Sequence, residues 1–163
     1  MSGRRTIRER VSLSGVGLHL GRACTLTFAP GATGAGIVFR RTDLPGAPET
    51  AAIAKNAILA ERRTQLGEGE GALHTVEHVL AAIAGASIDD VIIEMDAAEP
   101  PILDGSARPF FDALKSSGIV EHGGHVELLR LGKAVCHVDL RAGARPAHRR
   151  GHGGLRASTA PMS

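Results

Sequence analysis

The feature that most limits the fold of this chain is where its large apolar residues stop. They recur through the first 135 of its 163 residues, but beyond Leu140 only Leu155 and Met162 remain. A segment with so little apolar surface cannot offset the conformational entropy that it would lose on ordering. We therefore predict one folded domain, residues 1–135, followed by a disordered tail rich in Arg, Gly, Ala and His, residues 136–163.

Charge is divided unevenly between these two parts. The tail holds five of the 19 Lys and Arg residues but only one of the 17 Asp and Glu residues, so the net charge of +2 comes from the tail. The predicted domain is mildly acidic. With four Phe and no Tyr or Trp, the chain lacks the aromatic residues of a base-stacking platform. We expect no specific nucleic-acid partner; the tail could give only weak, salt-sensitive binding to nucleic acid or anionic lipid.

The cysteines and apolar runs indicate the compartment. Cys24 and Cys136 form neither a disulfide framework nor a C-x-x-C metal pair. The longest apolar run, residues 79–88, contains Gly85 and is far shorter than the roughly 20 residues of a membrane span. The basic residues 1–10 are not followed by the apolar core of a signal peptide. We predict a cytoplasmic protein with no membrane span.

Strands are predicted where apolar and β-branched residues alternate between turn residues. The predicted strands are residues 6–14, 24–28, 37–40, 90–94 and 127–135. The Gly-rich spacing of the first three favours an antiparallel meander. Residues 42–56 contain three Pro or Gly breaks and are predicted to form a loop or short insert.

The clearest helix is predicted over residues 75–85, with His74 or Thr75 at its start and Gly85 as its C-terminal cap. Its apolar residues recur at i, i+3, i+4 and i+7, which produces one apolar stripe. The stripe consists of Val76, Val79, Leu80 and Ile83.

A second helix is predicted over residues 107–117, ended by Gly118. Its expected inner face consists of Phe110, Phe111 and Leu114. The preceding residues, from Asp104 to Ser106, have the composition of a turn that also caps the helix.

Glu77 and His78 stand together in the first turn of the first helix. Successive helical residues are about 100° apart, so we expect this pair to lie opposite the apolar stripe, on a face shared with Ala81 and Ala82. Small residues there leave room for a ligand. A neutral imidazole can bind zinc, and a neighbouring carboxylate can accept a proton from a metal-bound water. The alternative interpretation is two polar residues on an exposed helix surface.

His74 and His78 have the i, i+4 spacing of the two zinc-binding histidines in H-E-x-x-H proteins. The carboxylate, however, directly precedes the second histidine instead of following the first, and His74 could equally face water. The tail histidines have no ligand-like spacing; they are His137, His148 and His152.

The glycines at 15, 17 and 21 do not match the dinucleotide-binding pattern G-x-G-x-x-G, and no βαβ unit follows them. They favour a tight connection between strands. The surrounding glycines indicate that His19 is exposed, so its side chain could reach a functional site.

Four blocks, taken together and in order, carry a family resemblance. They are residues 11–19 (VSLSGVGLH), 36–44 (GIVFRRTDL), 75–82 (TVEHVLAA) and 104–110 (DGSARPF). They closely resemble the N-terminal half of the UDP-3-O-acyl-N-acetylglucosamine deacetylases of Gram-negative bacteria. The resemblance covers roughly residues 4–135.

This resemblance implies a zinc-dependent (Zn2+) hydrolase that removes acetate from the sugar nitrogen, the committed step of lipid A and hence lipopolysaccharide synthesis. It implies an α/β fold of the two-layer α+β kind, with a small β-sheet packed against two helices, as the first of two similar domains that enclose the active site. The substrate would be a UDP-sugar carrying an acyl chain. His78 would be a zinc ligand, Glu77 the general base, and His19 a neighbour of the active-site mouth; His74 would not be a ligand.

The sequence departs from the family after Val135. The family's other zinc ligands lie in a His-Lys-x-x-Asp motif of the second domain, where a further His donates a proton, and this sequence contains no such motif. The change in composition is typical of a reading-frame shift or a truncated gene model. We therefore expect an incomplete copy. Alternatively, the chain is a catalytically silent single-domain fragment that acts by binding a partner through the apolar face left exposed by the missing domain.

Overall fold

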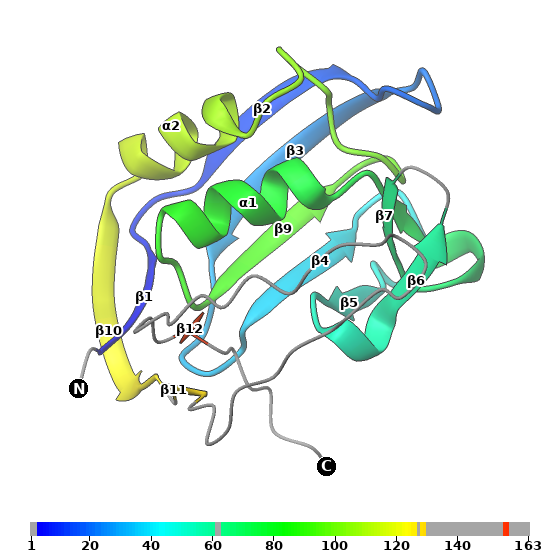
Figure 1. The fold of residues 1–163 in the computed structure, drawn as a ribbon. Coiled ribbons are helices and arrows are strands. Elements are labelled where there is room, and N and C mark those ends of the chain that lie inside the picture. Colours follow the sequence, from blue (N-terminus) through cyan, green and yellow to red (C-terminus); the bar gives the residue numbers. More distant parts are fainter. Residues whose placement is uncertain (1–2, 61–62, 127, 130–154, 157–163) are drawn as a thin grey trace, which may run out of the picture.

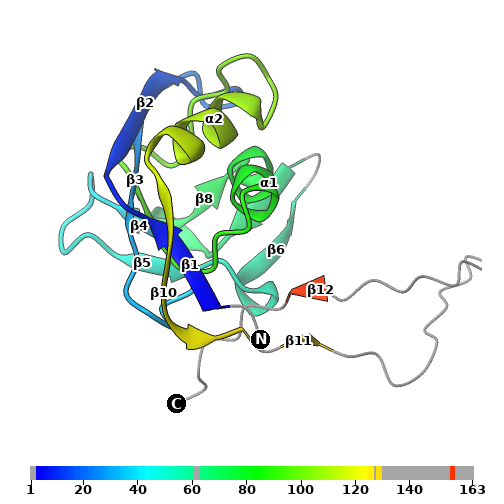
Figure 2. The ribbon, with the colours of Figure 1, turned by 90° about the vertical axis from the view of Figure 1, so that its left-hand side faces the viewer.

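The computed structural model describes residues 3–60, 63–126, 128–129 and 155–156 of the chain. A five-stranded mixed sheet forms one layer, with the strand order β2-β3-β9-β4-β5. Its strands are β2 (Val11–Val16), β3 (Ala23–Pro30), β4 (Ile37–Arg41), β5 (Glu49–Ala51) and β9 (Val91–Met95). Both α-helices, α1 (Glu77–Gly85) and α2 (Arg108–Ser116), cover the same face of this sheet (Figures 1 and 2). The predicted fold class, a small sheet packed against two helices, is confirmed.

Smaller pairings surround the main sheet. A three-stranded antiparallel sheet consists of β6 (Ala57–Ala60), β7 (Arg63–Leu66) and β8 (Leu73–His74). Two antiparallel pairs are β1 (Gly3–Ile7) with β10 (Ile119–His125), and β11 (Leu128–Leu129) with β12 (Leu155–Arg156). Two 3-10 turns complete the elements, η1 (Ala54–Asn56) and η2 (Gly69–Gly71).

The core lies between the main sheet and the two helices. Three of the four phenylalanines are fully buried in it, and the rings of Phe28 and Phe110 meet edge to face with centroids 6.5 Å apart. Phe110 and Leu114 are the buried residues of α2, and Phe111 packs against them partly exposed. The inner face predicted for the second helix is therefore confirmed. Among the described residues, neither helix has the length and apolar character needed to cross a bilayer.

Helix α1 confirms the predicted apolar stripe but corrects the prediction for its opposite face. Val79 and Ile83 are fully buried, whereas Ala81 is exposed as expected. Ala82 is only 1% exposed and belongs to the core. The reason is helical geometry: Ala82 follows Val79 by three positions, so the two side chains lie on the same side of the helix.

The C-terminal cap of α1 also differs from the prediction. Gly85 is the last helical residue, and the left-handed conformation that ends the helix falls on Ser87, with φ of +54°. By contrast, Gly118 ends α2 as predicted, with φ of +74°. The Asp104 turn is confirmed too, because its carboxylate accepts hydrogen bonds from Ser106, whose hydroxyl oxygen in turn accepts one from the Arg108 backbone N–H. The predicted cap is wrong by one residue, since the N-cap of α2 is Ala107, which makes no side-chain capping hydrogen bond.

The predicted first strand, residues 6–14, is wrong in its extent. Its beginning belongs to β1, which pairs with β10, whereas its end belongs to β2, which pairs with β3. The chain changes partner where Arg8 and Glu9 donate backbone hydrogen bonds to the carbonyls that follow α2. Local composition cannot reveal a change of partner, because pairing depends on segments far away in the sequence.

The predicted meander is also wrong, because β9 inserts between β3 and β4, antiparallel to the first and parallel to the second. Val91, Ile93 and Met95 are fully buried, as suits the central strand of a sheet. The segment at 42–56, predicted as a loop, contains the short strand β5, and the sequence did not indicate β6, β7, β8 or β10.

The predicted strand over residues 127–135 lies mostly outside the described residues; within it, residues 128–129 form β11. The predicted disordered tail, 136–163, also lies outside them, apart from residues 155–156, which form β12. The disorder of the tail stays a prediction.

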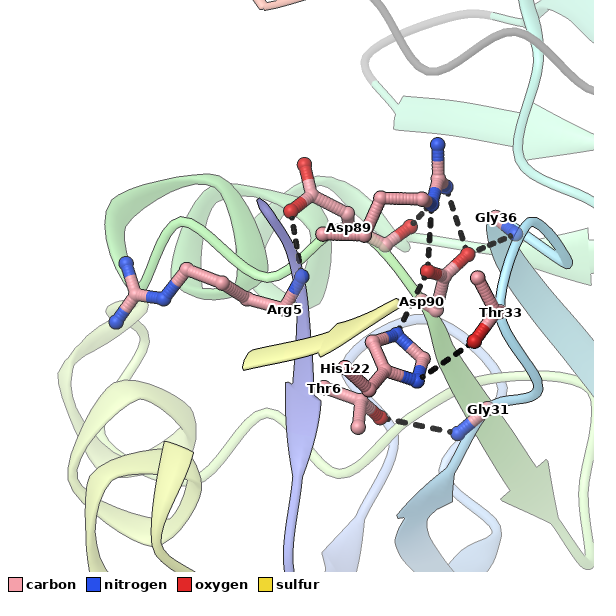
Figure 3. Close-up of polar contacts among 9 residues, drawn as sticks. Arg5, Thr6, Gly31, Thr33, Gly36, Asp89, Asp90 and His122 are labelled. Atoms are coloured by element: carbon pink, nitrogen blue, oxygen red, sulfur yellow. Dashed lines mark hydrogen bonds and ion pairs between the residues drawn. The ribbon is translucent and has the colours of Figure 1, made fainter. Parts of the chain in front are cut away.

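A buried ionic cluster ties β1 and β10 to the start of β9 (Figure 3). Asp90 is fully buried and accepts two hydrogen bonds of 2.7 Å from Arg4 and one of 2.8 Å from the backbone N–H of Gly36. Nε2 of His122 lies 2.9 Å from the same carboxylate. Burial by itself raises the pKa of Asp90, but the hydrogen bonds from Arg4, Gly36 and His122 outweigh it and hold that pKa below its usual value.

Candidate functional site

The candidate site lies where β2 and β9 end and α1 begins (Figure 1). Three segments meet there. They are the connection between β2 and β3, the segment that follows β9, and the residues leading into α1. All are joined by hydrogen bonds described below.

The start of α1 is shaped by a turn at Thr75. Strand β8 pairs with β7 and ends at His74, which lies opposite Gln65. Thr75 then takes a positive φ of +56°, which turns the chain into the helix. The hydroxyl of Thr75 does not cap the helix but donates a 2.7 Å hydrogen bond to Oε1 of Glu99. The first helical residues are therefore positioned by tertiary contacts and not by a side-chain cap.

Glu77 and His78 occupy the first turn of α1 and are both partly exposed. Oε2 of Glu77 accepts a 3.1 Å hydrogen bond from the backbone N–H of Thr64 in β7, which orients the carboxylate. His78 lies near the turn at Asp104. Hydrogen bonds from Ser106 are the main cause of the lowered pKa of Asp104, and His78 contributes in the same direction. Two of the four segments that carry the family resemblance, residues 75–82 and 104–110, therefore lie close together in the structure.

His74 is partly buried, and its Nδ1 is enclosed without a hydrogen-bond partner among the described residues. Burial, followed by the charge of Arg63, lowers its pKa, so the imidazole is neutral at pH 7. Within the part of the chain that the structure describes, Nε of Arg63 is likewise enclosed without a hydrogen-bond partner.

The part of the chain that the structure describes does not form a complete zinc site. Nowhere in residues 3–60, 63–126, 128–129 and 155–156 do three or more His, Cys, Asp or Glu residues gather closely enough to hold a metal ion. A catalytic zinc ion usually takes three protein ligands. The described residues therefore fit at most a partial contribution to such a site.

His19 is exposed, in the connection between β2 and β3. Its backbone N–H lies 3.1 and 3.0 Å from the two oxygens of Glu99, and the N–H of Leu20 donates to Oε2 at 2.7 Å. Gly17 packs directly against the same carboxylate, since a Cβ added there would lie 2.6 Å from Oε2. This close contact explains why position 17, one of the three glycines predicted to form a tight connection between strands, has no side chain.

Glu99 is the residue of this site that sequence analysis missed. It is only 2% exposed and lies in the segment between β9 and α2. Burial raises the pKa of Glu99, but hydrogen bonds from Leu20, Thr75 and His19 outweigh it and hold the pKa below its usual value. One weak signal was available: Glu99 follows two alanines and directly precedes two prolines.

Three exposed apolar side chains lie beside His19 at the same end of the molecule. This apolar loop tip consists of Val16, Leu18 and Leu20, which are 52%, 56% and 43% exposed. Exposed aliphatic residues that cluster in this way are typical of a surface that binds something apolar.

Arg41 explains part of another resemblance block, at 36–44. It is buried, forms two hydrogen bonds to Asp43 and donates to the carbonyls of Glu70 and Ala72 just before β8. Its role is structural, because it fixes the segment that leads to Thr75.

Glu77 and His78 place a carboxylate and an imidazole side by side on one helical turn, while the exposed His19 lies in the connection between β2 and β3, whose backbone is bound to Glu99. Such groups can accept and hold protons and can contribute to metal binding. Among the described residues, the arrangement supplies one oriented carboxylate and at most part of a metal site.

Comparison with known proteins gives a consistent result. Residues 4–150 match the family described as UDP-3-O-acyl N-acetylglycosamine deacetylase (LpxC). The chain is 46% identical over 117 residues to the bifunctional enzyme LpxC/FabZ of Chlorobaculum tepidum, covering 72% of this chain and 25% of that protein. It is 44% identical over 135 residues to the UDP-3-O-acyl-N-acetylglucosamine deacetylase of Myxococcus xanthus, covering 83% and 43%. It is 45% identical over 143 residues to the protein of the same name from Vibrio vulnificus, covering 85% and 46%. The chain spans less than half the length of these relatives.

Proposed function

The chain belongs to the UDP-3-O-acyl N-acetylglycosamine deacetylase family, and from this premise we propose that Glu77 and His78 are its contribution to a zinc-dependent deacetylase site. The observation that carries the proposal is the first turn of α1, where both side chains are partly exposed: the Glu77 carboxylate is held by the N–H of Thr64, and His78 lies near the Asp104 turn. In this proposal Glu77 is the general base and His78 is one metal ligand.

The carboxylate of Glu77 is suited to take a proton from a water molecule that attacks an amide carbon. Its orientation is fixed by the N–H of Thr64 at 3.1 Å, and a positioned base of this kind typically contributes about 10²–10⁴-fold to a rate. Because the described residues do not complete a zinc site, further ligands would have to come from outside them. We derive no step through the metal.

The proposed substrate is an acylated UDP-sugar, as the names of the relatives indicate. The apolar loop tip beside His19 supports this proposal, because exposed Leu18 and Leu20 would suit a hydrocarbon chain. UDP-sugars are made in the cytoplasm, so we propose that the reaction runs there.

A second candidate function is the binding of a partner without catalysis. The apolar loop tip favours it, since three exposed aliphatic side chains at one end of the fold can serve as a contact surface. A chimera of the kind described below that folds but shows no zinc-dependent deacetylation would favour this candidate.

The test is a chimera in which residues 4–126 of this chain replace the aligned residues of the Myxococcus xanthus relative. We expect zinc-dependent deacetylation that falls by at least 10²-fold in Glu77→Gln and in His78→Ala. His74→Ala is the matched control, because it removes a neighbouring imidazole that the proposal leaves unused, and it should stay within a few-fold of the parent. Full activity in Glu77→Gln, or an equal loss in His74→Ala, would contradict the assignment.

The chain alone gives a second measurement. Titration with Zn2+ should reveal weak binding, and deacetylation should be undetectable, because one imidazole lacks the further ligands that catalytic zinc requires. Tight one-to-one zinc binding that is lost in both His78→Ala and His74→Ala would mean that the two histidines act as a pair.

A further inference from the structure

Glu99 is a buried acid for which the proposed chemistry has no use. It is 2% exposed, although a buried carboxylate is costly unless hydrogen bonds satisfy it. It follows β9 on a segment that contains neither proposed catalytic residue. Its surroundings therefore have to explain why a charged side chain is kept there.

Both carboxylate oxygens of Glu99 are occupied by donors from two distant parts of the sequence. Oε1 accepts from the hydroxyl of Thr75 at 2.7 Å, and Oε2 accepts from the backbone N–H of Leu20 at 2.7 Å. The N–H of His19 lies within 3.1 Å of each oxygen. Hydrogen bonds to an ionised group are shorter and stronger than neutral ones, so this acid is a strong cross-link.

The loop that carries His19 sits directly on this segment. The added Cβ at Gly17 would lie 2.6 Å from Oε2 of Glu99, and one at Gly15 would lie 2.9 Å from Cβ of Pro101. The N–H of Ile102 donates to the carbonyl of Val16 at 2.9 Å. Small residues thus allow the loop backbone to approach the acid closely.

The other end of the cross-link is the turn into α1. Thr75 has φ of +56°, a conformation that β-branched residues rarely adopt and that persists only where the surroundings impose it. Its hydroxyl is bound to Glu99, and it precedes Glu77 by two residues. A change at Glu99 is therefore transmitted to the first turn of the helix.

We propose that Glu99 is a positioning residue, which holds the loop bearing His19 and the turn bearing Glu77 and His78 in one fixed arrangement. The inference rests on the proposed function for the identity of the site, and it adds the residue that assembles it. Glu99 itself does not touch the reacting atoms.

The test is amide hydrogen exchange, followed by NMR on the full chain without metal or substrate. In the parent protein, the N–H groups of His19 and Leu20 should exchange at least tenfold more slowly than in an unstructured chain, although both residues are exposed. The Leu20 amide proton should also resonate downfield, as expected for a short bond to a carboxylate. Glu99→Gln keeps the shape but removes the charge and one acceptor oxygen, so both features should be lost.

A matched pair of variants separates positioning from general stability. Thr75→Val removes the hydroxyl that binds Glu99, and Thr6→Val makes the same change at an equally buried threonine in β1, whose hydroxyl accepts from Gly31. Thr75→Val should shift the amide signals of Glu77 and His78 and accelerate exchange at Leu20. Thr6→Val should leave those signals in place.

Two results would overturn the inference. One is exchange of the His19 and Leu20 amides at unstructured rates in the parent, which needs no variant to fold. The other is an equal response of the Leu20 amide to Thr6→Val and Thr75→Val. Neither result depends on zinc or activity. The proposed function can therefore fail in the chimera while this inference stands, and this inference can fail in the exchange experiment while the proposed function stands.

Discussion

Replacing Asp90 by Asn should destabilise the fold strongly, because it leaves the buried guanidinium of Arg4 without its counter-charge. The Arg4 side chain is 8% exposed and that of Asp90 is fully buried, so solvent screens the pair little. Removing one partner of a buried pair costs about 3–5 kcal/mol. Asn keeps the size of Asp and one acceptor oxygen, which favours the lower end, about 3 kcal/mol. That is a large part of the roughly 5–15 kcal/mol that stabilises a typical domain.

The assay is urea unfolding followed by far-UV circular dichroism, since the chain has no Trp or Tyr to report by fluorescence. The unfolding midpoint should fall by about 1 M or more. Asp112→Asn is the matched control, because it makes the same change in the Arg108–Asp112 pair, whose side chains are 75% and 52% exposed. That exposed pair should contribute no more than about 0.5 kcal/mol. If Asp90→Asn and Asp112→Asn lose equal stability, the argument from burial is refuted.

Two further predictions concern acid stability and the end of α1. Asp90 and Glu99 have lowered pKa values, because their hydrogen bonds outweigh the effect of burial. Their stabilisation is therefore complete above the ordinary carboxyl pKa of about 4 and is lost as the pH falls through the lowered values. Urea unfolding from pH 6 to 2 should reveal this loss, and a flat profile would contradict it. Ser87→Gly should raise the free energy of unfolding by about 1 kcal/mol, because Ser87 has φ of +54°; an unchanged or lower value in the same assay would show that the left-handed cap carries no strain.

The two helices and the turn at Asp104 could be predicted from the sequence because the forces that form them act between near neighbours. The stripe formed by Val79 and Ile83 repeats every three to four residues, and Gly118 stops α2 where its φ is positive. The same local pattern singled out Glu77 and His78. Their chemical roles remain proposals.

The strand order could not be predicted, because it depends on contacts between segments far apart in the sequence. β9 lies between β3 and β4 although more than forty residues separate it from either. Its sequence, apolar apart from Glu94, suits a central strand, but the same residues would suit other buried positions.

By itself, the sequence determined the helices, most of their buried faces and the pair of residues that the proposed chemistry uses, since each is encoded in a short window. Only the tertiary structure decided that Glu99 would join His19 to Thr75, because a buried acid has no periodic signature and its meaning lies in which donors surround it. Ala82 is the opposite case: its small size is compatible with either side of α1, but its three-residue spacing from Val79 already places it on the buried side, so the local pattern contained the answer.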